Sequence, residues 1–89
     1  MEIEFTKNAL KDLKYWKKTN NTSIQERITL LLKDIVKHPF SGIGKPEALK
    51  HRLKGYWSRR ITKEHRIVYK VVNNKIIIVA ALRFHYDSL

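Results

Sequence analysis

The chain has 89 residues, with 19 lysines and arginines against 8 aspartates and glutamates, which gives a formal net charge of +11 at pH 7. Hydrophobic residues make up 43% of it, enough for one small core, and this argues against intrinsic disorder. The lack of cysteine excludes disulfides, thiolate catalysis and cysteine-bound metals. The longest apolar run, 76–82, is too short to span a membrane, and the start MEIEF does not look like a secretory signal. We expect one soluble, cytoplasmic domain over residues 1–89.

The positive charge points to a polyanionic partner. Nucleic acid is the first candidate, an acidic protein the second and an anionic membrane surface the third. The alternative is that the charge serves only solubility, but +11 exceeds what solubility normally requires of a domain this small.

The first elements expected are a strand and a helix. Residues 2–5 alternate polar and apolar side chains, which suits a short strand. Thr6 can cap a following helix, in which Leu10, Leu13 and Trp16 recur at three-residue spacing. We expect Trp16 to lie in the core or at its rim.

A second helix is predicted to begin at Ser23, where Glu26 three residues later would complete a capping box. Pro39 ends this helix, because the residue before a proline is disfavoured in helical geometry. One apolar stripe runs along it, formed by Ile24, Ile28, Leu31, Leu32 and Ile35. The segment 39–49, with two glycines and two prolines, is predicted to be a structured loop of the kind that often carries functional groups.

Three strands are predicted after this loop, over about 52–61, 66–72 and 75–84. Asn73 and Asn74 tolerate the positive φ angles of a two-residue hairpin turn between the last two strands. The order is therefore β-α-α-β-β-β, which predicts an α+β domain with both helices packed on one face of a twisted antiparallel sheet.

The expected hairpin assigns side chains to the two faces of the sheet. A two-residue turn pairs Val72 with Lys75 and Arg66 with Ala81. One face then carries Arg66, Val68, Val79, Ala81, Arg83 and His85. The bulkier face is expected to pack against the helices, and it carries Ile67, Tyr69, Val71, Ile76, Ile78, Leu82 and Phe84.

Arg66, Arg83 and His85 thus converge, and this set of side chains suits phosphoryl transfer. Arginines can stabilise the charge of a phosphorane, and an imidazole can protonate a leaving oxygen. In RNA the 2′-hydroxyl can itself attack the adjacent phosphate once a base removes its proton, so no metal or other cofactor is required. The four histidines show no helical i,i+4 pair and no carboxylate cluster, so a metal site is not expected. Taken singly, each of these residues is more often a solvated surface group.

Three stretches of the sequence resemble the YoeB/Txe family of toxins, which belong to type II toxin–antitoxin systems within the RelE/ParE superfamily. They are P-F-S-G-I-G-K-P-E-A-L-K-H over 39–51, G-Y-W-S-R-R-I-T-K-E-H-R-I-V-Y over 55–69 and R-F-H-Y over 83–86. Together they cover much of the chain in the family's order and spacing. The resemblance implies a RelE-like fold and a ribosome-dependent endonuclease that cuts mRNA codons in the A site without a metal.

The resemblance also implies roles for individual residues. Glu47 would be the general base for the 2′-hydroxyl, Arg66 would stabilise the phosphorane, His85 would be the general acid and Tyr86 would orient the nucleotide. RNA contacts would come from the basic residues Lys45, Lys50, Arg59, Arg60 and Arg83. The pairing pattern does not decide whether Arg59 or Arg60 faces the site. In the family His-Tyr commonly closes the chain, whereas here Asp87, Ser88 and Leu89 follow.

The partners implied by the resemblance are the ribosome with its mRNA and a cognate antitoxin of the YefM/Axe type, through which the complex would bind operator DNA. Family members can be homodimers. Two alternatives share the fold: a ParE-like gyrase inhibitor, which would not need Glu47 or His85, and a catalytically inactive module that binds RNA or the ribosome.

Overall fold

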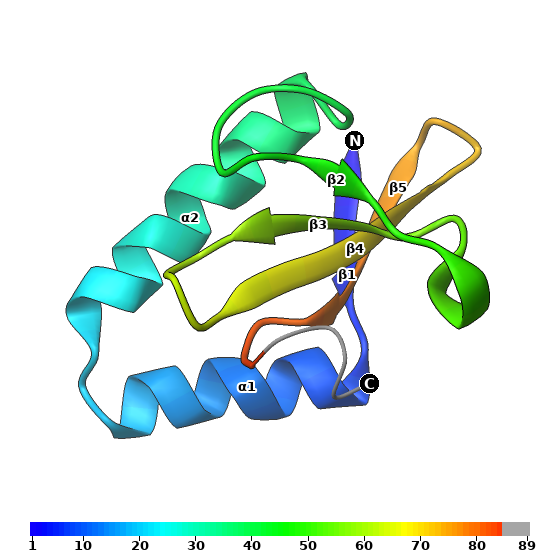
Figure 1. Ribbon diagram of the computed structural model, residues 1–89. Helices are drawn as coiled ribbons and strands as arrows, with labels where there is room; N and C mark the ends of the chain where they lie inside the picture. Colours follow the sequence, from blue (N-terminus) through cyan, green and yellow to red (C-terminus); the bar gives the residue numbers. More distant parts are fainter. Residues whose placement is uncertain (85–89) are drawn as a thin grey trace.

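The computed structural model describes residues 1–84, which form two helices against a five-stranded sheet (Figure 1). The elements in chain order are β1 (Glu2–Phe5), α1 (Lys7–Lys18), α2 (Thr22–Lys37), β2 (Glu47–Ala48), the 3₁₀ turn η1 (His51–Leu53), β3 (Trp57–Arg60), β4 (Arg66–Val72) and β5 (Ile76–Ala81). The strand order is β1-β5-β4-β3-β2. This confirms the α+β class. The sheet is mixed, however, because β1 runs parallel to β5 while the other pairs are antiparallel.

The helix starts depend on side-chain caps. The Thr6 hydroxyl accepts a hydrogen bond from the amide of Ala9 at 3.2 Å, which confirms the predicted cap of α1. The predicted start of α2 at Ser23 with a Glu26 capping box is wrong. Asn21 caps this helix instead, because its side-chain oxygen accepts a hydrogen bond from the amide of Ile24 at 3.2 Å. Asparagine is as good a cap as serine, so the helix begins at Thr22.

The main core lies between the helices and one face of the sheet. Its buried members are Ala9, Trp16, Ile24, Ile28, Leu31, Ile35, Ile61, Ile67, Tyr69, Ile77, Val79 and Leu82. The predicted stripe of α2 is confirmed, with Leu32 only half-buried. Leu10 is 46% exposed and Ala9 is buried instead, because the inward side of α1 runs through Ala9, Asp12 and Trp16 at i, i+3 and i+7.

The hairpin turn forms where it was predicted but with a different register. Asn73 and Asn74 have φ angles of +52° and +55°, and the Lys75 amide donates to the Val72 carbonyl at 3.0 Å. The ladder nevertheless begins with Val72 opposite Ile76, so Lys75 belongs to the turn. In consequence the predicted pairing is wrong by one residue along the first part of β5.

This one-residue difference reverses the faces of β5. Ile77 and Val79 face the helices, where Ile76 and Ile78 were expected. A register shift at Val68 and Tyr69 then pairs Val68 with Ala81, so the predicted pairing of Arg66 with Ala81 is also wrong. Beyond this shift Leu82 packs in the main core, as predicted.

A second, smaller cluster covers the other face of the sheet. It consists of buried Leu49, Val68 and Ala81, with Leu53 and Tyr56 packed against them. The predicted strand 52–61 is shorter than expected, because its beginning forms η1 and the turn that returns the chain to β3. The predicted loop 39–49 contains the short edge strand β2. Within the part of the chain that the structure describes, no helix is long and apolar enough to cross a membrane.

Candidate functional site

Strand pairing brings Glu47, Arg60 and Arg66 to one face of the sheet. Glu47 lies opposite Ser58, and Arg60 lies opposite Arg66. Directly opposed residues share a face, and so do residues two apart on one strand, so all four side chains leave the sheet on the same side. This is the face of the second cluster, away from the helices, because Val68 lies opposite Ser58.

The residues of this set lie within one or two strand spacings of each other. Two strand spacings and two residues along a strand separate the Cα atoms of Glu47 and Arg66 by about 12 Å. The Arg66 guanidinium lies at the turn between β3 and β4, where its Nη1 is held. Arg60 starts from the strand between them.

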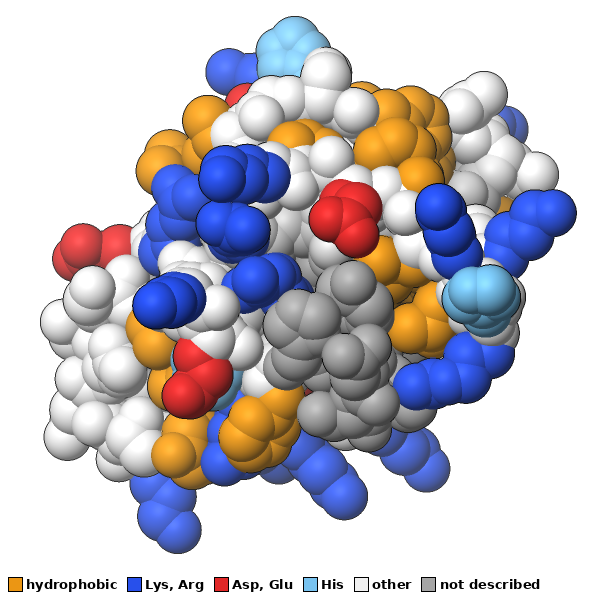
Figure 2. All heavy atoms as spheres, viewed as in Figure 1, with side chains coloured by type: hydrophobic (Ala, Val, Ile, Leu, Met, Phe, Trp, Pro, Cys, Tyr) orange, Lys and Arg blue, Asp and Glu red, His pale blue; other side chains and the backbone are white. Residues whose placement is uncertain are grey.

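A hollow of about 370 Å³ opens beside Glu47. It is lined by residues Glu47 to Leu53, so the carboxylate and Lys50 border the same space. Lys45, Lys50 and Arg60 are exposed. Seen in the direction of Figure 1, the surface carries Lys and Arg side chains in groups with few acidic side chains among them (Figure 2). A polyanion would therefore be attracted to the region that carries the one carboxylate expected to act as a base.

Arg66 is half-buried, and the turn between β3 and β4 holds its guanidinium. Its Nη1 donates to the carbonyls of Thr62 at 2.8 Å, Lys63 at 3.1 Å and His65 at 3.1 Å. Within residues 1–84 all hydrogen bonds of this guanidinium leave from Nη1, so a phosphate can be contacted through its other N–H groups. A guanidinium fixed in this way loses little further freedom when it binds an anion.

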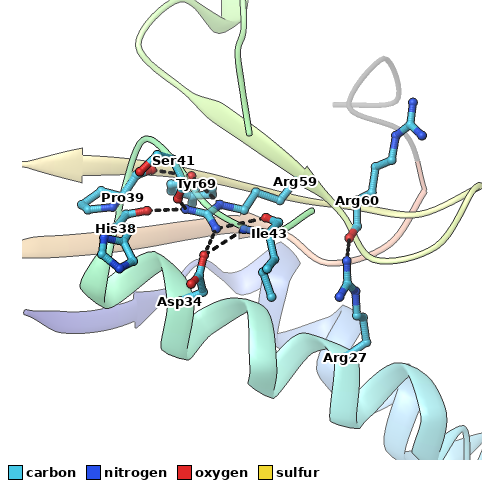
Figure 3. A network of polar contacts seen from close by, with 9 residues as sticks. All are labelled: Arg27, Asp34, His38, Pro39, Ser41, Ile43, Arg59, Arg60 and Tyr69. Carbon is cyan, nitrogen blue, oxygen red and sulfur yellow. Dashed lines mark hydrogen bonds and ion pairs between the residues drawn. The ribbon is translucent and has the colours of Figure 1, made fainter. Parts of the chain in front are cut away.

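Arg59, in contrast, lies inside the protein and is fully buried (Figure 3). Its Nη1 forms an ion pair with the Asp34 carboxylate at 2.5 Å, and its Nε donates to the Tyr69 hydroxyl at 3.1 Å. The guanidinium also donates to the carbonyls of His38, Ser41 and Ile43. The expected RNA contact of Arg59 is therefore wrong, because strand alternation turns Arg59 inward and Arg60 outward.

The Arg59 network fixes the loop that precedes Glu47. The Arg59 guanidinium beside Asp34 holds the pKa of this carboxyl below its usual value. Burial raises the pKa of the Tyr69 hydroxyl, which keeps its proton and donates to the Pro39 carbonyl at 2.6 Å. Farther along, the amide of Arg60 donates to the carbonyl of Gly44 at 2.7 Å. Asp34 could not be identified from the sequence, because it belongs to no recognisable motif and lies beside the apolar stripe of α2.

His85 and Tyr86 lie outside the described residues. The structure does place the residue before them, since the amide of Arg66 donates to the carbonyl of Phe84 at 3.0 Å. A backbone hydrogen bond therefore joins Arg66 to the last described residue.

Arg83 is held at α1, which differs from the expected convergence with Arg66. The carbon of its guanidinium lies 3.5 Å from the centre of the Tyr15 ring and 4.3 Å from that of Phe84. β5 ends at Ala81, so the alternation that predicted a shared face does not continue to Arg83. Among the described residues, no three histidine or acidic side chains are grouped to hold a metal ion.

Comparison with known proteins gives a consistent result over the whole chain. The family described as YoeB-like toxin of bacterial type II toxin-antitoxin system matches residues 5–86. The toxin YoeB of Synechocystis sp. is 48% identical over 98% of this chain and 99% of its own length. A YoeB/ParE toxin structure from Agrobacterium tumefaciens superposes with a TM-score of 0.92 at 41% identity, covering 97% of this chain and 100% of that one.

Structures from Staphylococcus aureus show related toxins in assemblies. A heterotetrameric YoeB-YefM toxin–antitoxin complex superposes with a TM-score of 0.86 at 44% identity, and a YoeB dimer superposes with the same score at 42% identity. Each covers 97% of this chain and 98% of the chain compared.

Proposed function

The chain belongs to the YoeB-like toxins of bacterial type II toxin–antitoxin systems, and we propose that it is a ribosome-dependent endonuclease that cleaves mRNA codons in the A site and so inhibits translation. The observation that carries the proposal is the placement of Glu47, Arg60 and Arg66 on one face of the sheet, where Glu47 also borders a hollow together with Lys50.

The proposed reaction needs no group beyond the protein and the RNA. The Glu47 carboxylate accepts the proton of a 2′-hydroxyl, and the oxygen attacks the adjacent phosphorus. Arg66 and the opposite Arg60 stabilise the negative charge of the phosphorane, and Lys50 adds a positive charge near Glu47. His85 donates a proton to the departing 5′-oxygen, and Tyr86 orients the nucleotide. The products are a 5′-hydroxyl end and a 2′,3′-cyclic phosphate, which water can open to a 3′-phosphate.

The proposal extends to partners and location. A cytoplasmic antitoxin of the YefM/Axe type would neutralise the toxin, and the complex would bind operator DNA through the antitoxin. The Staphylococcus aureus YoeB-YefM complex and YoeB dimer support an antitoxin partner and a homodimer for this chain. The net charge of +11 supports binding to ribosomal RNA and mRNA.

The test is cleavage of mRNA in a translating extract, with 5′ ends mapped by primer extension. We expect the parent protein to cut within codons, and Glu47→Gln and His85→Ala to lose cleavage. Glu26→Gln, at an exposed glutamate of α2, is the matched control and should cleave like the parent. Equal cleavage by parent, Glu47→Gln and His85→Ala would contradict the mechanism.

Two further outcomes separate the alternatives. Toxicity that survives both substitutions, together with inhibited gyrase and intact mRNA, would favour the ParE-like activity. Ribosome binding by the parent without any mRNA cleavage would favour a non-catalytic module.

A further inference from the structure

Side chains from α1 hold both backbone groups of Leu82. The Leu82 amide donates to the Asp12 carboxylate at 2.9 Å, and the Trp16 indole N–H donates to the Leu82 carbonyl at 2.9 Å. Asp12 is 8% exposed and Trp16 is 4% exposed, so these bonds are shielded from water. The chain is therefore fixed to α1 immediately after β5 ends.

Phe84, two residues later, is held on both sides by the turn between β3 and β4. Its amide donates to Nδ1 of His65 at 2.7 Å, and its carbonyl accepts from the amide of Arg66 at 3.0 Å. Its φ angle of +63° turns the chain sharply at this point. The His65 ring packs edge-on against Trp16, with ring centres 4.9 Å apart, so the two holding sites touch.

The contacts of His65 define its tautomer. Nδ1 accepts the Phe84 N–H, so it carries no proton, and the ring proton is on Nε2. Nε2 lies 3.1 Å from a carboxylate oxygen of the exposed Glu64 side chain.

We propose that Asp12, Trp16 and His65 form a clamp that positions the general acid, with His65 Nδ1 as its decisive contact. This inference rests on the proposed function, because it concerns the placement of His85 relative to Arg66. The clamp ends at the residue directly before His85, and Arg66 itself supplies one of its hydrogen bonds. An acid must lie within hydrogen-bond reach of the leaving oxygen, and a shift of about 1 Å can cost about 100-fold in rate. His65 is a positioning residue and takes no part in proton transfer to RNA.

Two isosteric substitutions test the decisive contact. In His65→Asn the amide oxygen can occupy the place of Nδ1 and still accept from Phe84, whereas in His65→Gln the polar group lies near the place of Nε2. We expect His65→Gln to lower kcat for cleavage of ribosome-bound mRNA by at least about 10-fold with little change in KM. His65→Asn should restore most of the activity. A role limited to overall stability would give losses that follow the melting temperature, whichever atom is replaced.

A second measurement does not depend on activity. Exchange of the Phe84 amide proton, followed by NMR, should be faster in His65→Gln than in the parent and should stay slow in His65→Asn. Amides of β4 away from the turn serve as the internal control for global unfolding. Equal exchange of Phe84 in all three proteins would overturn the clamp even if a variant were too unstable for the activity assay.

The outcomes separate this inference from the proposed function. If the parent protein does not cut ribosome-bound mRNA, the proposed function fails. If His85→Ala cleaves like the parent, the general-acid role of His85 fails. If His85→Ala is inactive while His65→Gln cleaves like the parent, only the clamp fails. Equal loss of kcat in His65→Asn and His65→Gln would also overturn the proposal, because the Nδ1 contact would then not be decisive.

Discussion

The Nη1 atom of Arg59 lies 2.5 Å from the Asp34 carboxylate inside the protein, although the next residue of the same strand, Arg60, is exposed. Two adjacent arginines thus have different roles. Arg59 joins β3 to α2 and to the loop before Glu47, and Arg60 presents its guanidinium on the face of the proposed site.

This contrast predicts opposite effects of the same substitution. Arg59→Met leaves a buried tyrosine hydroxyl and three carbonyls without their donor, so we expect a loss of at least about 2 kcal/mol in the free energy of unfolding. Arg60→Met should unfold like the parent but cleave RNA more slowly. Urea titration and the cleavage assay measure the two effects, and similar stabilities of the two variants would refute the assignment.

Asp34 predicts how stability changes in acid. Its pKa is lowered in the folded protein by the Arg59 hydrogen bond, so its contribution is fully present above the unfolded pKa near 3.8 and is lost as the pH falls through the folded value. Asp34→Asn should therefore be less stable than the parent at pH 7, and the difference should shrink below about pH 4. Urea unfolding between pH 7 and pH 3 tests this; parallel curves for the two proteins would contradict it.

The stability contribution of Asp12 changes with pH in the opposite direction. Burial raises the pKa of this carboxyl in the folded protein, so folding disfavours its ionised form and stability falls as the pH rises above about 4. Asp12→Asn keeps an oxygen that can accept from the Leu82 amide and removes the charge. We expect this variant to be at least as stable as the parent at pH 7, whereas Asp12→Ala should be less stable. Thermal unfolding measures both, and a marked loss in Asp12→Asn would show that the charge itself is needed.

Gly44, in the loop before Glu47, can be compared with Gly55, which lies between η1 and β3. Both have positive φ, +81° at Gly44 and +96° at Gly55, but a Cβ at Gly44 would lie 2.8 Å from the Leu31 side chain while a Cβ at Gly55 meets nothing within 4 Å. Gly44→Ala should therefore cost more stability than Gly55→Ala. Because Gly44 also bonds the amide of Arg60, cleavage should fall only in Gly44→Ala. Equal melting temperatures would contradict the close contact.

Salt should weaken binding through the exposed cations. Each phosphate neutralised by a lysine or arginine releases counterions, so ribosome affinity should fall steeply with ionic strength. Lys50→Gln should reduce the magnitude of the slope of log affinity against log salt by about 1, the contribution of one phosphate contact. Lys75→Gln, at an exposed lysine of the β4–β5 turn, is the control and should leave the slope unchanged.

Several elements could be predicted from the sequence because they depend on residues close together in the chain. The Thr6 cap acts three residues away, the apolar stripe of α2 follows the helix period, and the two asparagines adopt positive φ by their own preference. The motifs that indicate the toxin family are likewise short runs of residues. The order of helix and strand patterns along the chain also predicted the α+β class, which the structure confirms.

Only the tertiary structure decided which arginine is buried, which side chains of β5 face the helices and what holds the chain before His85. The partners of Arg59 lie 10 to 25 residues away in sequence, and Asp12 and Trp16 reach Leu82 across 70 and 66 residues. A single extra turn residue and one register shift reassign the faces of β5. Such contacts depend on how the packed elements meet, and no local preference of the chain encodes them.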